Sequence, residues 1–284
     1  MDPEYLLTLS CPDQRGIVHA VTGFLAAHAC NILDSQQYGD RQTGRFFLRI
    51  HVAAEAPHEP SDALRAAFAN LASDFQMAWD LHDPANRDRV LILVSREGHC
   101  LNDLLFRARS GTLRADVVAV VSNHEDFRSL STSYDVPFHH IPVTTSTKPD
   151  AELELRRLLD EYAVDLSVLA RYMQVLSPEL AGHLTGRAIN IHHGLLPSFR
   201  GPRPYHQAHE RGVKLIGATA HYVTAGLDEG PIIEQEVSRI DHALEPEELV
   251  AVGRDLECVA LARAVRWHLE RRVLLNGVRT VVFR

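Results

Sequence analysis

The chain has 284 residues, of which 45% are hydrophobic and 23% charged, and this composition predicts a globular protein with one large domain or two smaller ones. Disorder, a collagen helix and a coiled coil are excluded. Its 37 acidic side chains outnumber its 29 basic ones, so the formal net charge is −8, and no cluster of lysine and arginine offers the basic surface that nucleic acids require. We therefore expect no nucleic-acid partner.

The cysteines, the histidines and the N-terminus bear on compartment and metal binding. No Cys-x-x-Cys pair occurs among the four cysteines, which disfavours disulfides and a thiolate zinc site. Several of the 17 histidines lie close in sequence, but no carboxylate or thiolate completes a zinc ligand set at a familiar spacing. No apolar stretch is long enough for a signal peptide or a bilayer span. We expect a cytoplasmic protein with no membrane partner, no metal and no tightly bound cofactor.

The first part of the chain alternates strand-like and helix-like patterns. The apolar spacing predicts strands over residues 5–10, 32–38, 46–54 and 75–82, and helices over 17–29 and 61–72. The order strand, helix, strand, strand, helix, strand is typical of the ferredoxin-like arrangement, an antiparallel sheet with both helices on one face. We therefore predict a complete α+β domain over residues 1–84.

A polar segment separates this domain from the rest of the chain. The sequence HDPANRD has the composition of a linker, and we place the linker at residues 85–88. From residue 89 onward, continuous apolar runs replace the alternating pattern, as in RVLILVS and VVAVVSN. Such runs indicate strands covered on both faces, and helical segments lie between them. Residues 89–284 are predicted to form an open, mainly parallel, Rossmann-like α/β domain, ending in a long helix and a hairpin turn at Asn276-Gly277.

Two segments of the second domain carry candidate catalytic residues. A buried-type strand, AINIH, brings Asn190 and His192 to its C-terminal end, where open α/β sheets bind ligands. In isolation, these two residues are better explained as a strand cap and a half-buried histidine with its hydrogen bonds satisfied. Asp228 follows the next strand, in a Leu-Asp-Glu-Gly-Pro turn. A carboxylate near an imidazole favours the imidazolium, which donates hydrogen bonds to a developing oxyanion.

The strings NIHHGLLPSF, LDEGPII and LARYMQVLSP resemble the folate-dependent formyltransferase family. The catalytic trio of that family is an Asn, a His two residues later and the Asp of an LDxGP loop. The resemblance implies that Asn190, His192 and Asp228 are catalytic here. It also implies folate contacts near the apolar MQVL segment, which in isolation reads more readily as core. The implied folate-binding residues are Met173, Gln174, Val175, Leu176, His193 and Arg203.

The CPDQRGIV turn of the first domain resembles an ACT domain, a regulatory ferredoxin-like module. An ACT domain ahead of a formyltransferase-type domain is the layout of the formyltetrahydrofolate deformylases, and the resemblance to that family covers almost the whole chain. It implies that 10-formyltetrahydrofolate is the substrate and water the nucleophile, giving formate and tetrahydrofolate. The implied roles are formate supply for purine synthesis and balance of the one-carbon pool.

Two other functions stay open at this point. In acceptor-using relatives, a Gly-rich loop after the first strand holds a phosphate, whereas SREGHCLNDLL has only Gly98. Its absence favours hydrolysis, although an amine acceptor binding elsewhere would allow formyl transfer. His99 and Cys100 occupy this loop and are either a secondary site or packing residues. The second alternative is an amino-acid sensor without catalysis, which an intact catalytic trio disfavours.

The resemblance to ACT domains also implies an effector site. The turn at the start of the first helix offers backbone N–H groups suited to a carboxylate, and glycine or methionine is the kind of ligand implied. The alternative is that the domain serves only assembly, by pairing sheet edges. In both cases we expect a homo-oligomer, a dimer or a tetramer. The implied effector residues are Asp13, Gln14, Arg15, Gly16 and Ile17.

Overall fold

The computed structural model describes residues 3–56, 60–198 and 204–284, and the chain divides into two compact units. The first unit comprises residues 1–86 together with 270–274 and 281–284. The second comprises residues 87–269 together with 275–280. Among the described helices, none combines the length and apolarity that a bilayer-spanning segment needs.

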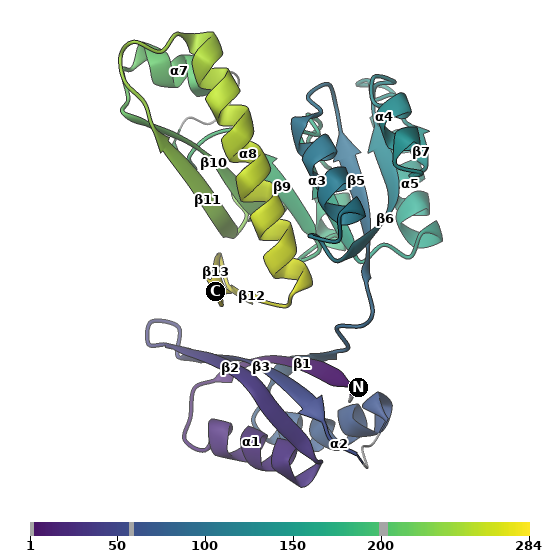
Figure 1. The fold of residues 1–284 in the computed structure, drawn as a ribbon, viewed down its shortest axis with the longest axis vertical. Coiled ribbons are helices and arrows are strands. Elements are labelled where there is room, and N and C mark those ends of the chain that lie inside the picture. The colour runs from purple at the N-terminus through teal and green to yellow at the C-terminus, as the bar shows by residue number, and fades with distance from the viewer. Residues whose placement is uncertain (1–2, 57–59, 199–203) are drawn as a thin grey trace. The chain divides into compact units, whose positions relative to one another are not determined.

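The first unit is a four-stranded antiparallel sheet with two helices on one of its faces (Figure 1). The strands lie in the order β2-β3-β1-β4, so the predicted ferredoxin-like fold is confirmed. Its elements are β1 (Glu4–Pro12), α1 (Ile17–Ala27), β2 (Cys30–Asp40), β3 (Arg45–Ala54), α2 (Ser61–Asp74) and β4 (Ala78–His82).

The core of this unit lies between the sheet and its helices. In β1, Leu7 and Leu9 are each 1% exposed and lie two residues apart, so they face the same side of the sheet. In α1, the buried residues Ile17, Val21 and Leu25 recur every four positions and form one apolar stripe. Burying each such side chain stabilises the fold by about 1.5–3 kcal/mol.

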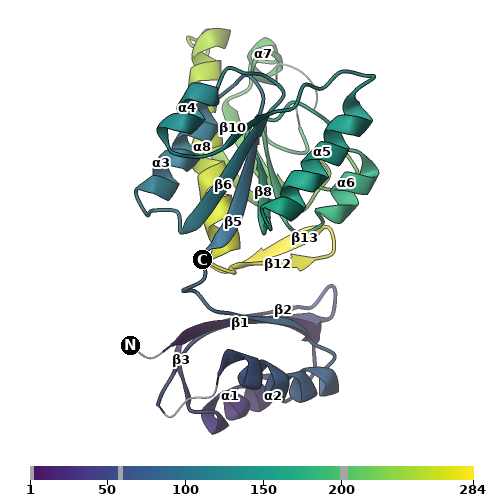
Figure 2. The ribbon, with the colours of Figure 1, turned by 90° about the vertical axis from the view of Figure 1, so that its right-hand side faces the viewer.

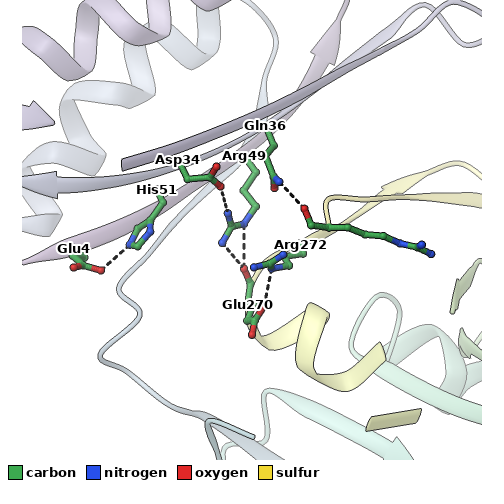
Figure 3. A network of polar contacts seen from close by, with 8 residues as sticks. Glu4, Asp34, Gln36, Arg49, His51, Glu270 and Arg272 are labelled. Carbon is green, nitrogen blue, oxygen red and sulfur yellow. Dashed lines mark hydrogen bonds and ion pairs between the residues drawn. The ribbon is translucent and has the colours of Figure 1, made fainter. Parts of the chain in front are cut away.

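The opposite face of the sheet carries a polar network (Figure 3). The guanidinium of Arg49 in β3 is almost fully buried and donates to the carbonyl oxygen of Glu270 at 3.1 and 3.2 Å and to Asp34 at 3.2 Å. Burial lowers the pKa of Arg49. Gln36 donates to the carbonyl of Arg284 at 2.9 Å. Residues from the C-terminal end of the chain therefore complete the first unit.

The second unit contains a seven-stranded sheet in the order β11-β10-β9-β8-β5-β6-β7. The pairs from β9 to β7 are parallel, whereas β10 is antiparallel to both β9 and β11, so the predicted mainly parallel sheet is confirmed. Helices cover both faces (Figure 2). The seven strands are β5 (Asp88–Val94), β6 (Ala115–Ser122), β7 (Phe138–His140), β8 (Leu166–Leu169), β9 (Ala188–His192), β10 (Leu215–Tyr222) and β11 (Ile232–Arg239).

The helices of the second unit cover strands that consist of continuous apolar residues. Every residue from Val90 to Val94 in β5 is buried, as expected for a strand with helices on both sides. The helices are α3 (His99–Arg109), α4 (Arg128–Ser133), α5 (Lys148–Glu161), α6 (Pro178–His183), α7 (Pro204–Glu210) and α8 (Pro246–Leu269). A separate hairpin, β12 (Val273–Asn276) and β13 (Arg279–Val282), turns at Gly277 with a φ of 63°.

Candidate active site

The C-terminal end of β9 presents two polar side chains from one face of the strand. Asn190 and His192 are two residues apart, and β10 pairs with β9 so that His221 lies opposite Asn190. The hydroxyl of Thr219, opposite His192, donates to the carbonyl of Gly194 at 2.8 Å and accepts from the amide of Leu196 at 3.1 Å. These bonds fix the chain just after His192.

The loop between β10 and β11 brings Asp228 to the same place. Its carboxylate lies 3.1 Å from Nδ1 of His192 and 3.6 Å from Nε2 of His221. Asp228 has a φ of 55°, an uncommon conformation for a residue other than glycine. The loop is tightly held, because a Cβ on Gly230 would lie 1.7 Å from the carbonyl oxygen of Tyr222. The structure thus brings Asn190, His192 and Asp228 together.

Electrostatics keep Asp228 ionised. Burial acts to raise its pKa, but hydrogen bonds and charge from His192 and His221 outweigh burial and hold the pKa well below its usual value. His192 is 4% exposed, and its Nε2 is buried without a hydrogen-bond partner among the residues that the structure describes. Burying an imidazole nitrogen without a hydrogen-bond partner destabilises the fold, so Nε2 is available to bind a ligand.

His221 was not among the catalytic residues predicted from the sequence, yet it contacts two of them. Its Nδ1 donates to the carbonyl of Tyr222 at 2.8 Å, and its Nε2 lies 3.2 Å from Nδ2 of Asn190 and 3.6 Å from Asp228. Nε2 therefore donates to Asp228 when the ring is protonated and accepts from Asn190 when the ring is neutral. In the neutral state, one N–H of the Asn190 amide is fixed and its second N–H is left for a ligand. The only signal for this residue was its strand, which precedes the Asp228 loop.

A cavity of about 280 Å³ opens beside these side chains. Its rim is apolar: Met173, Val175 and Leu227 are 57%, 52% and 63% exposed, respectively. Ser95 positions the rim, because its hydroxyl accepts from the amide of Met173 at 3.0 Å. Of the predicted folate-binding residues, those that line the cavity are Met173, Gln174, Val175, Leu176 and His193.

His193 lies between this cavity and a second one. Burial lowers its pKa to about 4, with the charge of Arg171 acting in the same direction. The ring is therefore neutral near pH 7 and supplies shape and hydrogen bonding rather than charge. Its ring centroid is 5.3 Å from that of His192 and 6.4 Å from that of Tyr205.

The second cavity, of about 270 Å³, contains a buried ionic cluster around Glu257 of α8. Glu257 is 1% exposed; its carboxylate accepts from His99 at 2.8 Å and from the Tyr205 hydroxyl at 2.9 Å, and it lies 3.4 Å from Nε of Arg171. Burial acts to raise the pKa of Glu257, but His99, Arg171 and Tyr205 outweigh it and leave the pKa lowered. The sequence-predicted His99 thus lies in this cluster and not on the first cavity.

Cys100 packs beneath the same cluster. It is fully buried, and a hydrogen bond with Cys258 together with burial raises its pKa, so it is a thiol. Potential ligand atoms of His99, Cys100 and Glu257 lie within 4.8 Å of one another, a spacing that a metal ion could use. The guanidinium of Arg171 beside Glu257 opposes a divalent cation at this position.

The remaining predicted site residues lie elsewhere. Arg203 falls outside the described residues. The turn over residues 13–17 belongs to the first unit, where Gly16 precedes α1 with a φ of 94° and the amide of Asp13 donates to Gly44 at 2.8 Å. Ile17 is buried, whereas the side chains of Asp13, Gln14 and Arg15 are exposed.

Comparisons with known proteins cover both units. A family model described as formyl transferase matches residues 88–265, and one described as ACT domain matches residues 5–68. The formyltetrahydrofolate deformylase of Corynebacterium sp. (strain P-1) is 56% identical over 280 residues, which are 99% of this chain and 98% of that protein. The formyltetrahydrofolate deformylase of Escherichia coli (strain K12) is 41% identical over 98% of this chain and 97% of its own.

Solved structures give the same result. The crystal structure of formyltetrahydrofolate deformylase from Burkholderia mallei ATCC 23344 has a TM-score of 0.95 and 52% identity, covering 99% of this chain and 100% of that one. Glycinamide ribonucleotide transformylase 1 from Symbiobacterium toebii has a TM-score of 0.66 and 30% identity, covering 70% of this chain and 95% of its own. The first similarity spans nearly the full chain, the second only a part.

Proposed function

The chain belongs to the formyltetrahydrofolate deformylases, a family of hydrolases, and on that premise we propose that Asn190, His192 and Asp228 catalyse the hydrolysis of 10-formyltetrahydrofolate to formate and tetrahydrofolate. One observation carries this assignment of residues. His192 is held by Asp228 through Nδ1, while its buried Nε2 lacks a partner in the described part of the chain and the residue lines the cavity.

Attack of water on the formyl carbon places negative charge on the formyl oxygen. The Nε2–H of a protonated His192 and the free amide N–H of Asn190 are the donors that stabilise this oxyanion. A neutral His221 orients Asn190 by accepting the other amide N–H. Donors fixed before the reaction need no reorganisation when the charge develops, and removing one such donor typically lowers the rate by about 10²–10³-fold.

Asp228 has two roles in this scheme. Its ionised carboxylate orients the His192 ring and stabilises the imidazolium, as expected from its low pKa. It also positions the attacking water or accepts its proton, directly or through a second water. The strained backbone at Asp228 is consistent with a residue held in place for chemistry.

The apolar rim suits a flat ring system such as a pteridine. The exposed apolar side chains of Met173, Val175 and Leu227 surround a cavity that ends in polar groups, the usual composition of a small-molecule site. Gln174 and Leu176 complete this wall. We assign the folate ring to this cavity, with the formyl group directed toward His192.

The loop after β5 supports water over an amine acceptor. Gly98 lies against the ring of Phe127, and a Cβ there would lie 2.3 Å from a ring carbon, so this glycine serves packing rather than an open phosphate loop. Formyl transfer and a non-catalytic sensor remain the alternative outcomes of the test below.

The cellular role follows from the products. We propose that the released formate supplies purine synthesis, that hydrolysis balances the one-carbon pool, and that the enzyme acts in the cytoplasm. The ACT domain suggests control by an amino acid such as glycine or methionine, bound through residues 13–17 of a homo-oligomer. A change in turnover on adding glycine or methionine, lost on substituting Arg15, would support this effector site.

The deciding experiment is an assay without any acceptor. The purified protein is incubated with 10-formyltetrahydrofolate alone, and formate and tetrahydrofolate are quantified. We expect both in equal amounts, with no increase on adding glycinamide ribonucleotide or another amine. Turnover that depends on the amine would establish a transferase instead, and no turnover under either condition would favour the sensor.

A further inference from the structure

The cavity at Glu257 adjoins the proposed catalytic cavity, and the two share a wall. Arg171, Met173 and His193 line both of them. The catalytic cavity takes the folate in the proposed function, and neither the catalytic trio nor the apolar rim uses the polar end of the second cavity. This end, formed by Arg171, His99 and Glu257, is called here the arginine pocket.

The carboxylates of this cavity are already paired. His99 and Tyr205 occupy the two oxygens of Glu257 with hydrogen bonds of 2.8 and 2.9 Å. The other carboxylate on the lining, Glu97, accepts from Arg254 at 2.8 Å. No uncompensated negative charge therefore lines the cavity among the described residues.

Nitrogen atoms of Arg171 and His99, by contrast, lack hydrogen-bond partners in the described part of the chain. Nη1 of Arg171 is buried without a hydrogen-bond partner among the described residues, and Nε lies within ion-pair distance of Glu257 but outside hydrogen-bond geometry. Nδ1 of His99 is likewise buried and unpartnered within the described chain, while Nε2 holds Glu257. Buried polar atoms left unpaired are costly, and the unpaired N–H groups of Arg171 point to an absent acceptor.

The backbone at Arg171 is consistent with this reading. Arg171 has a φ of 66°, in the left-handed region that residues other than glycine seldom adopt. Its carbonyl oxygen accepts from the amide of Ser95 at 3.1 Å, which fixes the residue just after β8. Strain of this kind concentrates at ligand sites, where the surrounding structure holds a side chain in position.

The planar guanidinium of Arg171 is suited to a small carboxylate, whose two oxygens accept its N–H groups. Nδ1 of His99 is a second donor to such a ligand when the ring carries both protons. The proposed hydrolysis generates such an anion, formate, in the adjoining cavity. We propose that the arginine pocket binds the product formate through Arg171 and His99, so that formate leaves the catalytic cavity by a route separate from the folate. This inference rests on the proposed function.

The test measures formate binding directly, independently of turnover. Binding of carbon-13 formate to the full-length protein without folate is followed by NMR line broadening, with ionic strength held constant by sodium chloride. The wild-type protein is compared with Arg171→Met and with His99→Gln, whose amide still donates to Glu257 but lacks the ring Nδ1. Arg109→Met, an exposed arginine of α3 outside the cavity, is the matched control.

We expect both pocket variants to weaken formate binding by about tenfold or more, because each removes a charge-assisted hydrogen bond, while Arg109→Met binds like the wild type. Retained binding in His192→Ala, which lacks one of the proposed oxyanion donors, separates this pocket from the catalytic site. Thermal unfolding shows whether each variant is folded. If Arg171→Met does not fold, His99→Gln still tests the proposal.

Three results would overturn the proposal. If formate binds the two pocket variants as tightly as it binds the wild type, its binding site lies elsewhere. If His192→Ala loses formate binding and Arg171→Met retains it, formate occupies the catalytic cavity. Acetate or glycine that competes with formate on equal terms makes the pocket a general carboxylate site and removes the link to the product. Failure of hydrolysis with formate binding intact contradicts only the proposed function.

Discussion

The carboxylate of Asp228 contacts two histidines of the catalytic cavity, His192 and His221. Replacing it by Asn keeps the shape but removes the charge that stabilises the His192 imidazolium. We expect Asp228→Asn to lower kcat by about 10²–10⁴-fold, the usual range for loss of acid–base catalysis. The measurement is tetrahydrofolate formation at saturating substrate.

The adjacent residue provides a matched control. Glu229 is exposed and lies in the same loop, so Glu229→Gln makes the same change of charge one position away. We expect its kcat to stay within about twofold of the wild type. A similar loss in both variants would mean that the loop, rather than the carboxylate of Asp228, is responsible.

His193 predicts a pH dependence of stability. Its pKa is about 4 in the folded protein and about 6.5 in an unfolded chain. Between pH 6.5 and pH 4, the unfolded state therefore binds a proton that the folded state does not bind. The contribution of His193 to the free energy of unfolding is largest above pH 6.5, falls as the pH drops toward 4 and is constant below that. Between pH 7 and pH 5 this contribution is about 2 kcal/mol.

The variant His193→Asn removes this titration. Its free energy of unfolding in urea should fall less between pH 7 and pH 5 than that of the wild type, by about 2 kcal/mol. His209→Asn, which replaces an exposed histidine of α7, should leave the pH dependence unchanged. An equal slope in wild type and His193→Asn would show that His193 titrates normally.

At the scale of elements, the loop from β10 to β11 depends on close backbone packing. A Cβ at Gly230 meets the carbonyl oxygen of Tyr222, which cannot move without disturbing β10. We expect Gly230→Ala to destabilise the second unit by about 1–3 kcal/mol and to lower kcat by displacing Asp228. Thermal unfolding and the acceptor-free assay measure the two effects.

Gly182 of α6 is the corresponding control, because a Cβ there has no neighbour within 4 Å. Gly182→Ala should retain full activity and gain up to about 1 kcal/mol, since alanine favours a helix over glycine. Full activity in Gly230→Ala would contradict the tight placement of the loop.

The elements also show what the sequence could predict. Long periodic segments such as α8, and continuous apolar runs such as β5, were predicted correctly because many residues share one pattern. The three-residue β7 and the short helices α4, α6 and α7 were not predicted, because few residues give little periodicity. The eight-residue β11 was also missed, because most side chains in its run EQEVSR are charged or polar and no continuous apolar run marks it. The linker at residues 85–88 stays a prediction.

Within the site, two local sequence motifs predict the catalytic trio, whereas no local motif predicts the cluster around Glu257. His99 and Glu257 are 158 positions apart, and a glutamate in a long helix reads as a solvent-exposed residue until the fold brings α3 and α8 together. The partners of Arg171 and Tyr205 could not be predicted for the same reason. Tertiary contacts between distant segments, rather than local pattern, create this second cavity.

At the scale of the whole molecule, the C-terminal residues 270–274 and 281–284 belong to the first unit, where Glu270 bonds to Arg49 and Arg284 bonds to Gln36. Arg49→Ala removes a buried guanidinium and leaves the Glu270 carbonyl without its donor. We expect a loss of about 2–3 kcal/mol in the stability of the first unit. Gln36→Ala, which removes one exposed hydrogen bond to Arg284, should cost less than about 1 kcal/mol.

Urea unfolding followed by hydrogen exchange of β1 and β3 reports on this unit separately from the second one. A loss in Arg49→Ala no larger than that in Gln36→Ala would mean that the C-terminal residues do not support the sheet. Hydrolysis by either variant should be retained, since neither residue lies on the catalytic cavity.

The rate of acceptor-free tetrahydrofolate formation by His192→Ala, at saturating 10-formyltetrahydrofolate, tests the catalytic assignment most directly. His209→Ala is the control, and binding of a non-hydrolysable folate confirms that the cavity is intact. We predict a fall of about 10²–10³-fold for His192→Ala, and none for His209→Ala. A His192→Ala protein that releases formate and tetrahydrofolate at the wild-type rate would contradict it.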